Sequence, residues 1–188
     1  NDLDDAVRLL SQHIPGPREE DESDYAWRYL WRLGHTRPKR LEGHKGDVYH
    51  VEYSPDGRAL ITAGQDATIR TWNAETGAPL RTFRGHEGDV DWATFSPDGR
   101  AIASCGNDGS VRLWDASDET KPSRILGKGD QEVVAVVFSP DGRSVYSGDH
   151  AGRLTRWDIA TGRGESAPDS LRTRVQSLAM ASDGRTLV

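Results

Sequence analysis

Short hydrophobic runs alternate with turn-forming residues through residues 41–188. The first group of runs covers 48–53, 59–63, 68–72 and 79–83, and these runs are rich in β-branched and aromatic residues. Runs of this length that end at Gly, Pro, Asn or Asp are typical of β-strands. The same pattern returns in two later groups, at 90–95, 101–105, 110–114 and 123–126, and at 133–138, 144–147 and 153–157. We therefore predict an all-β structure of short strands.

One five-residue motif marks each group of runs. Residues 54–58 read Ser-Pro-Asp-Gly-Arg, the motif returns at 96–100 and 139–143, and a weaker copy lies at 181–185. Its aspartates stand at positions 56, 98, 141 and 183, so the spacings are 42, 43 and 42 residues. Pro sets φ for the second turn position, Asp tolerates the third and Gly closes the turn. Each copy therefore predicts a tight turn between two strands, and four strands per period of this length indicate one blade of a propeller.

Dipeptides at fixed places in the pattern identify what it resembles. Gly43-His44 and Gly85-His86 precede the first strand of a group, and Trp114-Asp115 and Trp157-Asp158 end the third. These pairs resemble the signature of WD40 repeats, and the first unit departs slightly with Trp72-Asn73. The resemblance covers residues 41–188. It implies a partial WD40 β-propeller over 39–188, with units at about 44–84, 86–126 and 129–168 and the start of a fourth at 170–188. Residues 174–181 read as the inner strand of that fourth blade.

The resemblance also implies a structural tetrad in the blades. In that network an Asp in a tight turn accepts a hydrogen bond from a His ring, whose other nitrogen meets a Ser or Thr hydroxyl, which in turn meets the Trp indole N–H. Such a network satisfies its own polar groups and fixes how the strands pack. The matching residues are His44, Thr62, Asp66 and Trp72 in the first unit and His86, Ser104, Asp108 and Trp114 in the second.

The third unit keeps only part of this set. Ser147 and Trp157 remain, but Ala151 occupies the Asp position and Gly127-Lys128-Gly129 replaces Gly-His. We predict that the third blade lacks the network and is the least rigid of the three.

His, Asp and Ser together are also the residue types of a hydrolase triad. Here the set recurs in two units at one spacing, which a structural role explains and a single active site does not, and a triad is recognised by geometry. The six histidines show no ligand spacing such as His-x-x-x-His. We therefore expect no catalytic residue, no metal site and no cofactor in this segment.

The loops before each inner strand are candidates for a partner-binding rim. If these residues face one surface, the rim is mostly acidic, its protein partner is basic, and association weakens with salt. The alternative is that Asp47 and Asp89 serve their own turns. The candidate residues are Lys45, Asp47, Tyr49, Glu87, Asp89, Asp91, Asp130 and Glu132.

Charge and composition narrow the partners further. The net charge is −6, and no part carries the concentrated basic excess of a nucleic-acid footprint, so no nucleic-acid partner is expected. No apolar run is long enough to span a membrane and no signal peptide is visible, and a cytoplasmic location is favoured. The single cysteine, Cys105, excludes an intramolecular disulfide; it reads as a small buried strand residue, with a reactive thiol as the alternative.

Residues 1–38 predict a short helical lead and linker. One helix covers 1–13, and a second covers 23–33, where Tyr25, Trp27, Tyr29 and Trp31 could instead alternate as a strand. These aromatic side chains pack against the propeller or form an exposed docking face. A strand at 39–42 would be the outer strand of the blade that closes the ring.

The WD40 resemblance implies a non-catalytic scaffold for protein–protein interaction. The alternative is a regulatory or targeting platform of a larger enzyme, because residues 19–35 resemble the segment that precedes WD-repeat arrays in large bacterial proteins, some with a serine/threonine kinase domain. Propellers usually have four to eight blades. We therefore expect this sequence to be a fragment, with the missing C-terminal blades as further partners.

Overall fold

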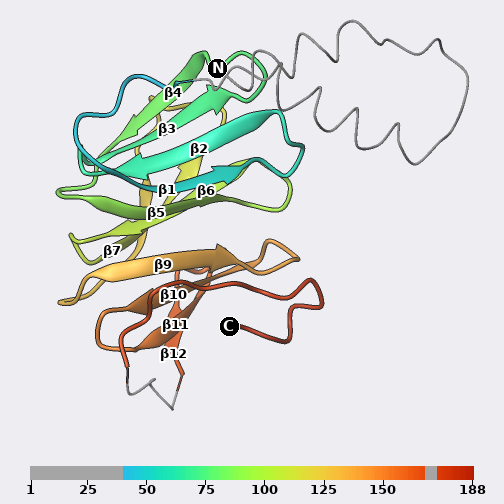
Figure 1. The fold of residues 1–188 in the computed structure, drawn as a ribbon. Helices are drawn as coiled ribbons and strands as arrows, with labels where there is room; N and C mark the ends of the chain where they lie inside the picture. The colour runs from blue at the N-terminus through green and yellow to red at the C-terminus, as the bar shows by residue number, and fades with distance from the viewer. Residues whose placement is uncertain (1–39, 168–172) are drawn as a thin grey trace, which may run out of the picture. The chain divides into compact units, whose positions relative to one another are not determined.

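The structure, a computed structural model, describes residues 40–167 and 173–188. In this part of the chain twelve strands form three four-stranded antiparallel sheets, and no helix is present (Figure 1). Within each sheet the strands are hydrogen-bonded in sequence order. The predicted helices at 1–13 and 23–33 lie outside the described residues. The all-β class and the four-stranded antiparallel blades are confirmed.

Each sheet is one blade, numbered in chain order. Blade one consists of β1 (Val48–Tyr53), β2 (Ala59–Gly64), β3 (Thr68–Asn73) and β4 (Pro79–Arg84). Blade two consists of β5 (Val90–Phe95), β6 (Ala101–Gly106), β7 (Ser110–Asp115) and β8 (Arg124–Lys128). Blade three consists of β9 (Val133–Phe138), β10 (Ser144–Asp149), β11 (Leu154–Asp158) and β12 (Gly164–Ser166).

The repeated turn joins the first two strands of every blade. In blade one Gly57 N–H donates to the Ser54 carbonyl at 2.8 Å, and the Asp56 carboxylate accepts from the Ser54 hydroxyl at 2.6 Å and from Arg58 N–H at 3.0 Å. Gly57 has φ near 70°, a left-handed conformation that favours glycine. The turns at 96–100 and 139–143 repeat these bonds, which confirms the predicted tight turns.

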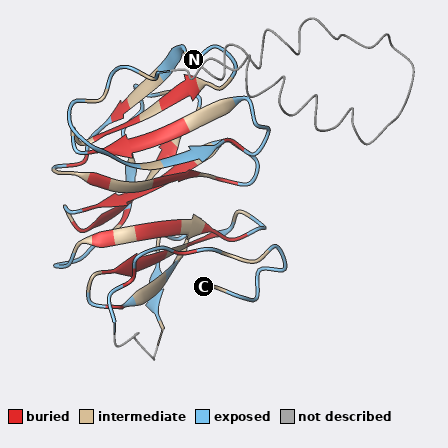
Figure 2. Cartoon of the chain, in the orientation of Figure 1, coloured by how far each residue is buried: buried red, intermediate tan, exposed pale blue. Residues whose placement is uncertain are grey.

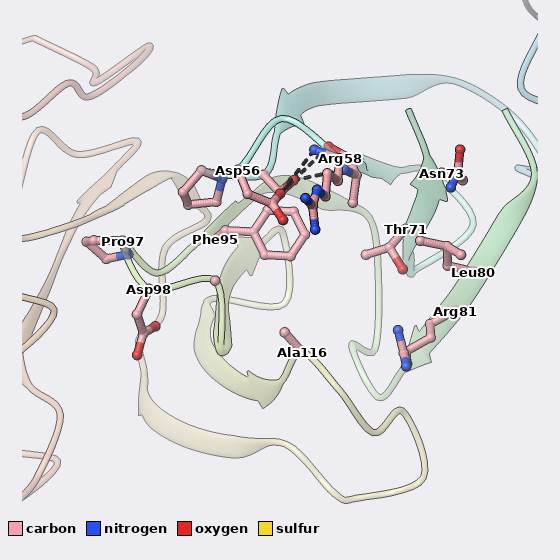
Figure 3. A pocket seen from close by; sticks show the side chains of 14 residues that line it. Asp56, Arg58, Thr71, Asn73, Leu80, Arg81, Phe95, Pro97, Asp98 and Ala116 are labelled. Carbon is pink, nitrogen blue, oxygen red and sulfur yellow. Dashed lines mark hydrogen bonds between the residues drawn. The ribbon is translucent and has the colours of Figure 1, made fainter. Parts of the chain in front are cut away.

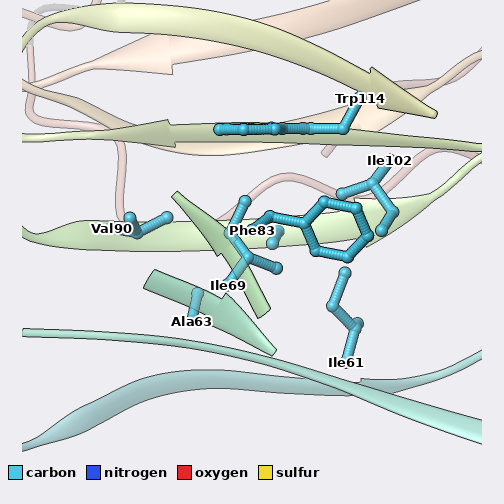
Figure 4. Close-up of a cluster of buried hydrophobic side chains, with 8 residues drawn as sticks. Ile61, Ala63, Ile69, Phe83, Val90, Ile102 and Trp114 are labelled. Carbon is cyan, nitrogen blue, oxygen red and sulfur yellow. The ribbon is translucent and has the colours of Figure 1, made fainter. Parts of the chain in front are cut away.

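The hydrophobic core lies between the blades (Figure 2). We call the contact between blades one and two the first seam, where Ile61, Ile69 and Phe83 meet Ile102 and Trp114 (Figure 4). The Phe83 and Trp114 rings meet edge-on with centroids 5.9 Å apart, a favourable aromatic geometry. Burial of apolar area in this seam holds neighbouring sheets face to face.

The second seam joins blades two and three. Cys105 and Val111 of blade two pack with Val136, Phe138 and Val145 of blade three. Cys105 is completely buried, and this burial raises the pKa of its thiol well above the usual range. The expectation of a buried strand cysteine is confirmed.

The inner strand of blade one has no such cover. Val51 and Tyr53 are 59% and 62% exposed, whereas Val136 and Phe138, which hold the same places in blade three, are 0% and 5% exposed. In blade three this face of the inner strand is buried against blade two. No described residues cover the same face of blade one.

Two predicted strands are wrong. Of the strand predicted at 39–42, the described residues 40–42 form no strand, and the inner strand predicted at 174–181 contributes a single bridge, Met180 to Leu187. A strand needs a second strand along its length, and the hairpin around 182–185 pairs no farther back than Ala179 with Val188. Val175 and Leu178 are nevertheless buried against Ala135 of blade three.

Candidate functional site

Blade two contains a complete hydrogen-bonded network. His86 Nδ1 lies 3.0 Å from the Asp108 carboxylate and His86 Nε2 lies 2.8 Å from the Ser104 hydroxyl. Trp114 Nε1 donates to the same hydroxyl at 2.8 Å. The four residues come from the loop before β5, from β6, from the β6–β7 turn and from β7, so the network ties the four parts of one blade together.

The proton positions in this network follow from its charges. Burial raises the pKa of Asp108, but bonds from the Ser110 hydroxyl and N–H, from Glu87 N–H and from His86 outweigh it and hold that pKa well below its usual value. The Asp108 carboxylate is therefore ionised and can only accept, so His86 Nδ1 carries the proton. Burial lowers the pKa of His86, so its ring is neutral and its Nε2 accepts from Ser104.

Blade one repeats this arrangement. His44 lies 2.8 Å from Asp66 and 2.7 Å from the Thr62 hydroxyl, to which Trp72 Nε1 donates at 2.8 Å. Burial raises the pKa of Asp66, but bonds from Thr68 and His44 lower it further than burial raises it. The predicted spacing thus brings each set of four residues together.

Blade three retains one bond of the network. Trp157 Nε1 donates to the Ser147 hydroxyl at 2.8 Å. Lys128, which with Gly129 stands where the other blades have histidine, pairs with Glu87 of the loop before β5 at 2.9 Å. A cavity of about 230 Å³ borders Ser147, Trp157 and Lys128. The His–Asp half of the network is therefore missing, and solvent-accessible space lies beside what remains.

Three candidate rim residues contact neighbouring strands or loops. The Tyr49 hydroxyl of blade one donates to Asp89 of blade two at 3.0 Å, and this bond raises the pKa of Tyr49. Glu87 pairs with Lys128, which lowers the pKa of the Glu87 carboxyl. The first contact joins β1 of blade one to the loop before β5, and the second joins that loop to the end of β8.

Carboxylates crowd together at the middle of the rim. Burial, and then the negative charges of Glu132 and Asp89, raise the pKa of Asp91 to about 7. One Asp91 carboxyl oxygen is buried and has no hydrogen-bond partner among the described residues. Glu132 in turn pairs with His150 at 2.8 Å. Asp91 therefore changes its charge near neutral pH.

The remaining rim residues differ in their contacts. Backbone N–H groups at Lys45 and Asp47 donate to Asp66 and Gln65, at 3.1 and 3.4 Å. The Asp130 side chain has no hydrogen bond or ion pair to the described residues and is exposed. The side chains of Lys45, Asp47 and Asp130 thus remain available to solvent.

One contact between the inner strands of blades one and two escaped the sequence analysis. The His50 ring of β1 stacks on Trp92 of β5 with centroids 3.9 Å apart. Burial lowers the pKa of His50 to about 4, so the stacked ring is neutral. Both residues occupy the third position of their inner strands, and this shared position is a signal that could have predicted the pair.

Comparison with known proteins identifies the repeats. The family model described as "WD domain, G-beta repeat" matches residues 35–73, 77–115 and 120–158. The chain belongs to the WD40 family. Each matched segment ends at the Trp-Asn or Trp-Asp pair that closes the third strand of a blade.

Several relatives share parts of the WD40 array. The chain is 39% identical over 64 residues to the Notchless protein homolog of Arabidopsis thaliana, which covers 33% of this chain and 14% of that protein. It is 40% identical over 63 residues to Ribosome assembly protein 4 of Saccharomyces cerevisiae, 32% of this chain and 12% of that protein. A probable E3 ubiquitin ligase complex SCF subunit sconB of Aspergillus oryzae is 29% identical over 97 residues, 42% of this chain and 14% of that protein. The match thus spans about a seventh of the length of these relatives or less.

Within residues 40–167 and 173–188 no group of three or more His, Cys, Asp or Glu is placed to hold a metal ion. The described residues also contain no helix that is long and apolar enough to cross a membrane.

Proposed function

We propose that this WD40 segment is a non-catalytic scaffold that binds a basic protein partner through its rim. The observation that carries the proposal is the row of acidic side chains along the loops before β1, β5 and β9. Six of the eight rim residues are Asp or Glu. The names of two relatives, a ribosome assembly protein and an SCF complex subunit, support a role in assembling other proteins.

The charges on the rim differ in how available they are. Glu87 is 72% exposed, and its partner Lys128 is 49% exposed, so solvent screens this pair and a cationic partner can compete for the carboxylate. Asp130 is exposed and unpaired among the described residues. Glu87 and Asp130 therefore form the part of the rim where a basic side chain meets the least competition.

A charge-reversal experiment tests the proposal. A fluorescein-labelled peptide of alternating Lys and Gly should bind the 188-residue chain, and binding should weaken as salt rises. The double variant Glu87→Lys/Asp130→Lys should weaken that binding by about tenfold or more, because both changes place like charges beside the peptide. Fluorescence anisotropy measures the dissociation constants.

The matched control carries the same change of charge elsewhere. Glu75 and Glu165 are exposed residues outside the rim, and Glu75→Lys/Glu165→Lys changes the net charge by the same amount. If both double variants weaken binding equally, only the net charge of the protein attracts the peptide, and the rim is not the binding site.

A further inference from the structure

A hollow lies at the opposite end of the strands from the rim. It occupies about 610 Å³ between blades one and two, beside the Ser-Pro-Asp-Gly-Arg turns of both blades. Phe95, Leu80, Ala116 and Pro97 give it an apolar lining (Figure 3). We call this space the turn-side groove. A pocket of this size accommodates a small ligand or a few residues of a peptide.

A buried hydroxyl in the groove lacks a partner. Thr71 is 3% exposed, yet its Oγ1 has no hydrogen-bond partner among the described residues. Figure 3 draws its side chain among those that line the groove, near Leu80. A buried polar atom without a partner is unfavourable and is normally satisfied by a ligand or by water. Thr71 therefore offers a hydrogen bond to an occupant.

The second seam shows what fills the same space between blades two and three. By strand register Leu113 holds the place of Thr71, because Ile61 pairs with Thr71 and Ala103 pairs with Leu113. Both Leu113 and Ile159 pack against the buried cluster of the second seam.

Ile159 holds the place of Ala116. Ala116 N–H donates to the Arg100 carbonyl at 2.9 Å, and Ile159 N–H donates to the corresponding Arg143 carbonyl at 3.0 Å. Aliphatic side chains thus occupy two positions in the second seam that small or polar residues hold in the first. The groove is therefore shaped for an aliphatic side chain that the protein itself does not supply.

Two arginines lie at the edge of the turn-side groove. The exposed Arg58 guanidinium makes no hydrogen bond or ion pair with the described residues, and Arg81 is joined only to the half-exposed Glu119, at 3.3 Å. Arg124, which holds the place of Arg81 in the second seam, donates to the Ile159 carbonyl at 2.7 Å. Arg81 is thus at a position from which a guanidinium reaches main-chain oxygen.

Two carboxylates beside the groove are already engaged. Asp56 accepts from Ser54 and Arg58 N–H, and Asp98 accepts from Ser96 and Arg100 N–H. In each carboxylate, both bonds are accepted by the same oxygen, Oδ1. The guanidinium groups of Arg58 and Arg81 therefore provide the unused charged hydrogen-bond donors at the edge of the groove.

We propose that the turn-side groove binds a short peptide segment of a partner protein, with one aliphatic side chain between acidic residues. The aliphatic side chain lies over Phe95, in the space that Leu113 and Ile159 fill in the second seam. The Thr71 hydroxyl bonds the peptide main chain, and Arg58 and Arg81 pair with the acidic side chains. This site is separate from the rim, and the two proposals stand or fall independently.

The test uses two labelled pentapeptides on the 188-residue chain. Fluorescence anisotropy should show that fluorescein-Gly-Glu-Leu-Glu-Gly binds. The same peptide with Ser in place of Leu should bind at least about tenfold more weakly, because it buries no aliphatic group. No binding of the Leu peptide, or equal binding of both peptides, would overturn the proposal.

A variant that fills the groove places the peptide in it. Thr71→Leu/Ala116→Ile rebuilds the first seam with the residues of the second and should weaken binding of the Leu peptide by about tenfold or more. Circular dichroism and the thermal midpoint check that the variant folds. Unchanged binding by a folded variant contradicts the groove as the site.

A charge variant decides the matter if the filled variant does not fold. Arg58→Glu should weaken binding of the Leu peptide by about tenfold. Arg143→Glu, at the same turn position of blade three, should leave that binding unchanged. Equal effects of the two variants would overturn the proposal. The rim variant Glu87→Lys/Asp130→Lys should bind the Leu peptide no more weakly than the unaltered chain, so failure of one site is distinguishable from failure of the other.

Discussion

Blades two and three have the same strand order and different polar interiors. In blade two, His86 links Asp108 to Ser104 and Trp114, and the Asp108 side chain is 3% exposed. Blade three has only the Ser147–Trp157 bond. Its four strands still pair antiparallel, and its inner strand is still buried in the second seam. The difference teaches that apolar packing between blades is sufficient to form a blade, and that the network adds hydrogen bonds between the loop before the inner strand and the rest of the blade.

The largest loss of stability is expected when the network is removed from blade two, which makes its polar interior resemble that of blade three. His86→Ala removes two buried hydrogen bonds, from the His86 ring to the Asp108 carboxylate and from the Ser104 hydroxyl to the ring. Asp108 keeps its bonds from Ser110 and Glu87 N–H, but the Ser104 hydroxyl loses its acceptor, so we expect the free energy of unfolding to fall by about 3 kcal/mol. Urea denaturation followed by tryptophan fluorescence measures the change.

The matched control is Lys128→Ala, at the position before blade three that corresponds to His86 before blade two. Lys128 takes part in an exposed ion pair with Glu87, and such pairs contribute about 0.5 kcal/mol or less. Equal losses from His86→Ala and Lys128→Ala would show that the two blades do not differ in the way described.

A smaller effect sharpens the comparison through the bond that both blades share. Trp114→Phe and Trp157→Phe each remove an indole N–H from a serine hydroxyl. We expect a loss of about 1.5 kcal/mol in blade two, where the freed hydroxyl is also bound to His86, and about half of that in the less buried blade three. Thermal unfolding of the two variants gives the ratio, and a larger loss in blade three would contradict the ranking.

The smallest effect concerns the rim, where the loops of blades two and three meet. The pKa of Asp91 is about 7 in the folded chain and 3.8 ordinarily, so between these values the folded state binds more protons than the unfolded state. Stability therefore falls as pH rises from about 4 to about 7. Asp91→Asn removes this cost and should stabilise the chain at pH 8 by about 1 kcal/mol, a figure reduced because Asp91 is half-exposed.

The measurement is the free energy of unfolding at pH 5 and at pH 8. The charged groups that face Asp91 are Glu132, Asp89 and Asp108, with His150 paired to Glu132, and all of them are present in both proteins. The difference between the variant and the unaltered chain should be larger at pH 8 than at pH 5. The opposite order would contradict the raised pKa.

Local features of this fold were predictable from the sequence. The Ser-Pro-Asp-Gly-Arg turns and the strands beside them depend on residues near in the chain, and the tetrad positions follow from a fixed spacing. The predicted strands at 39–42, of which residues 40–42 are described, and at 174–181 were wrong because a strand depends on a partner that local sequence does not reveal.

Features that depend on contact between blades were harder to predict. Asp91 and Glu132 belong to different blades, and the rise in the pKa of Asp91 results from burial together with that contact. The turn-side groove has a signal in the sequence, since Thr71 and Ala116 differ from Leu113 and Ile159. That signal acquires meaning only when strand register shows which positions correspond.

The buried thiol in the second seam has a consequence for following motion in this protein. Cys105 is the only cysteine of the chain, it is completely inaccessible, and it lies where blade two meets blade three. A reagent that modifies thiols can therefore reach the sulfur only after these blades separate. The rate of modification under native conditions reports how often the second seam opens, and its dependence on urea separates that opening from unfolding of the whole chain.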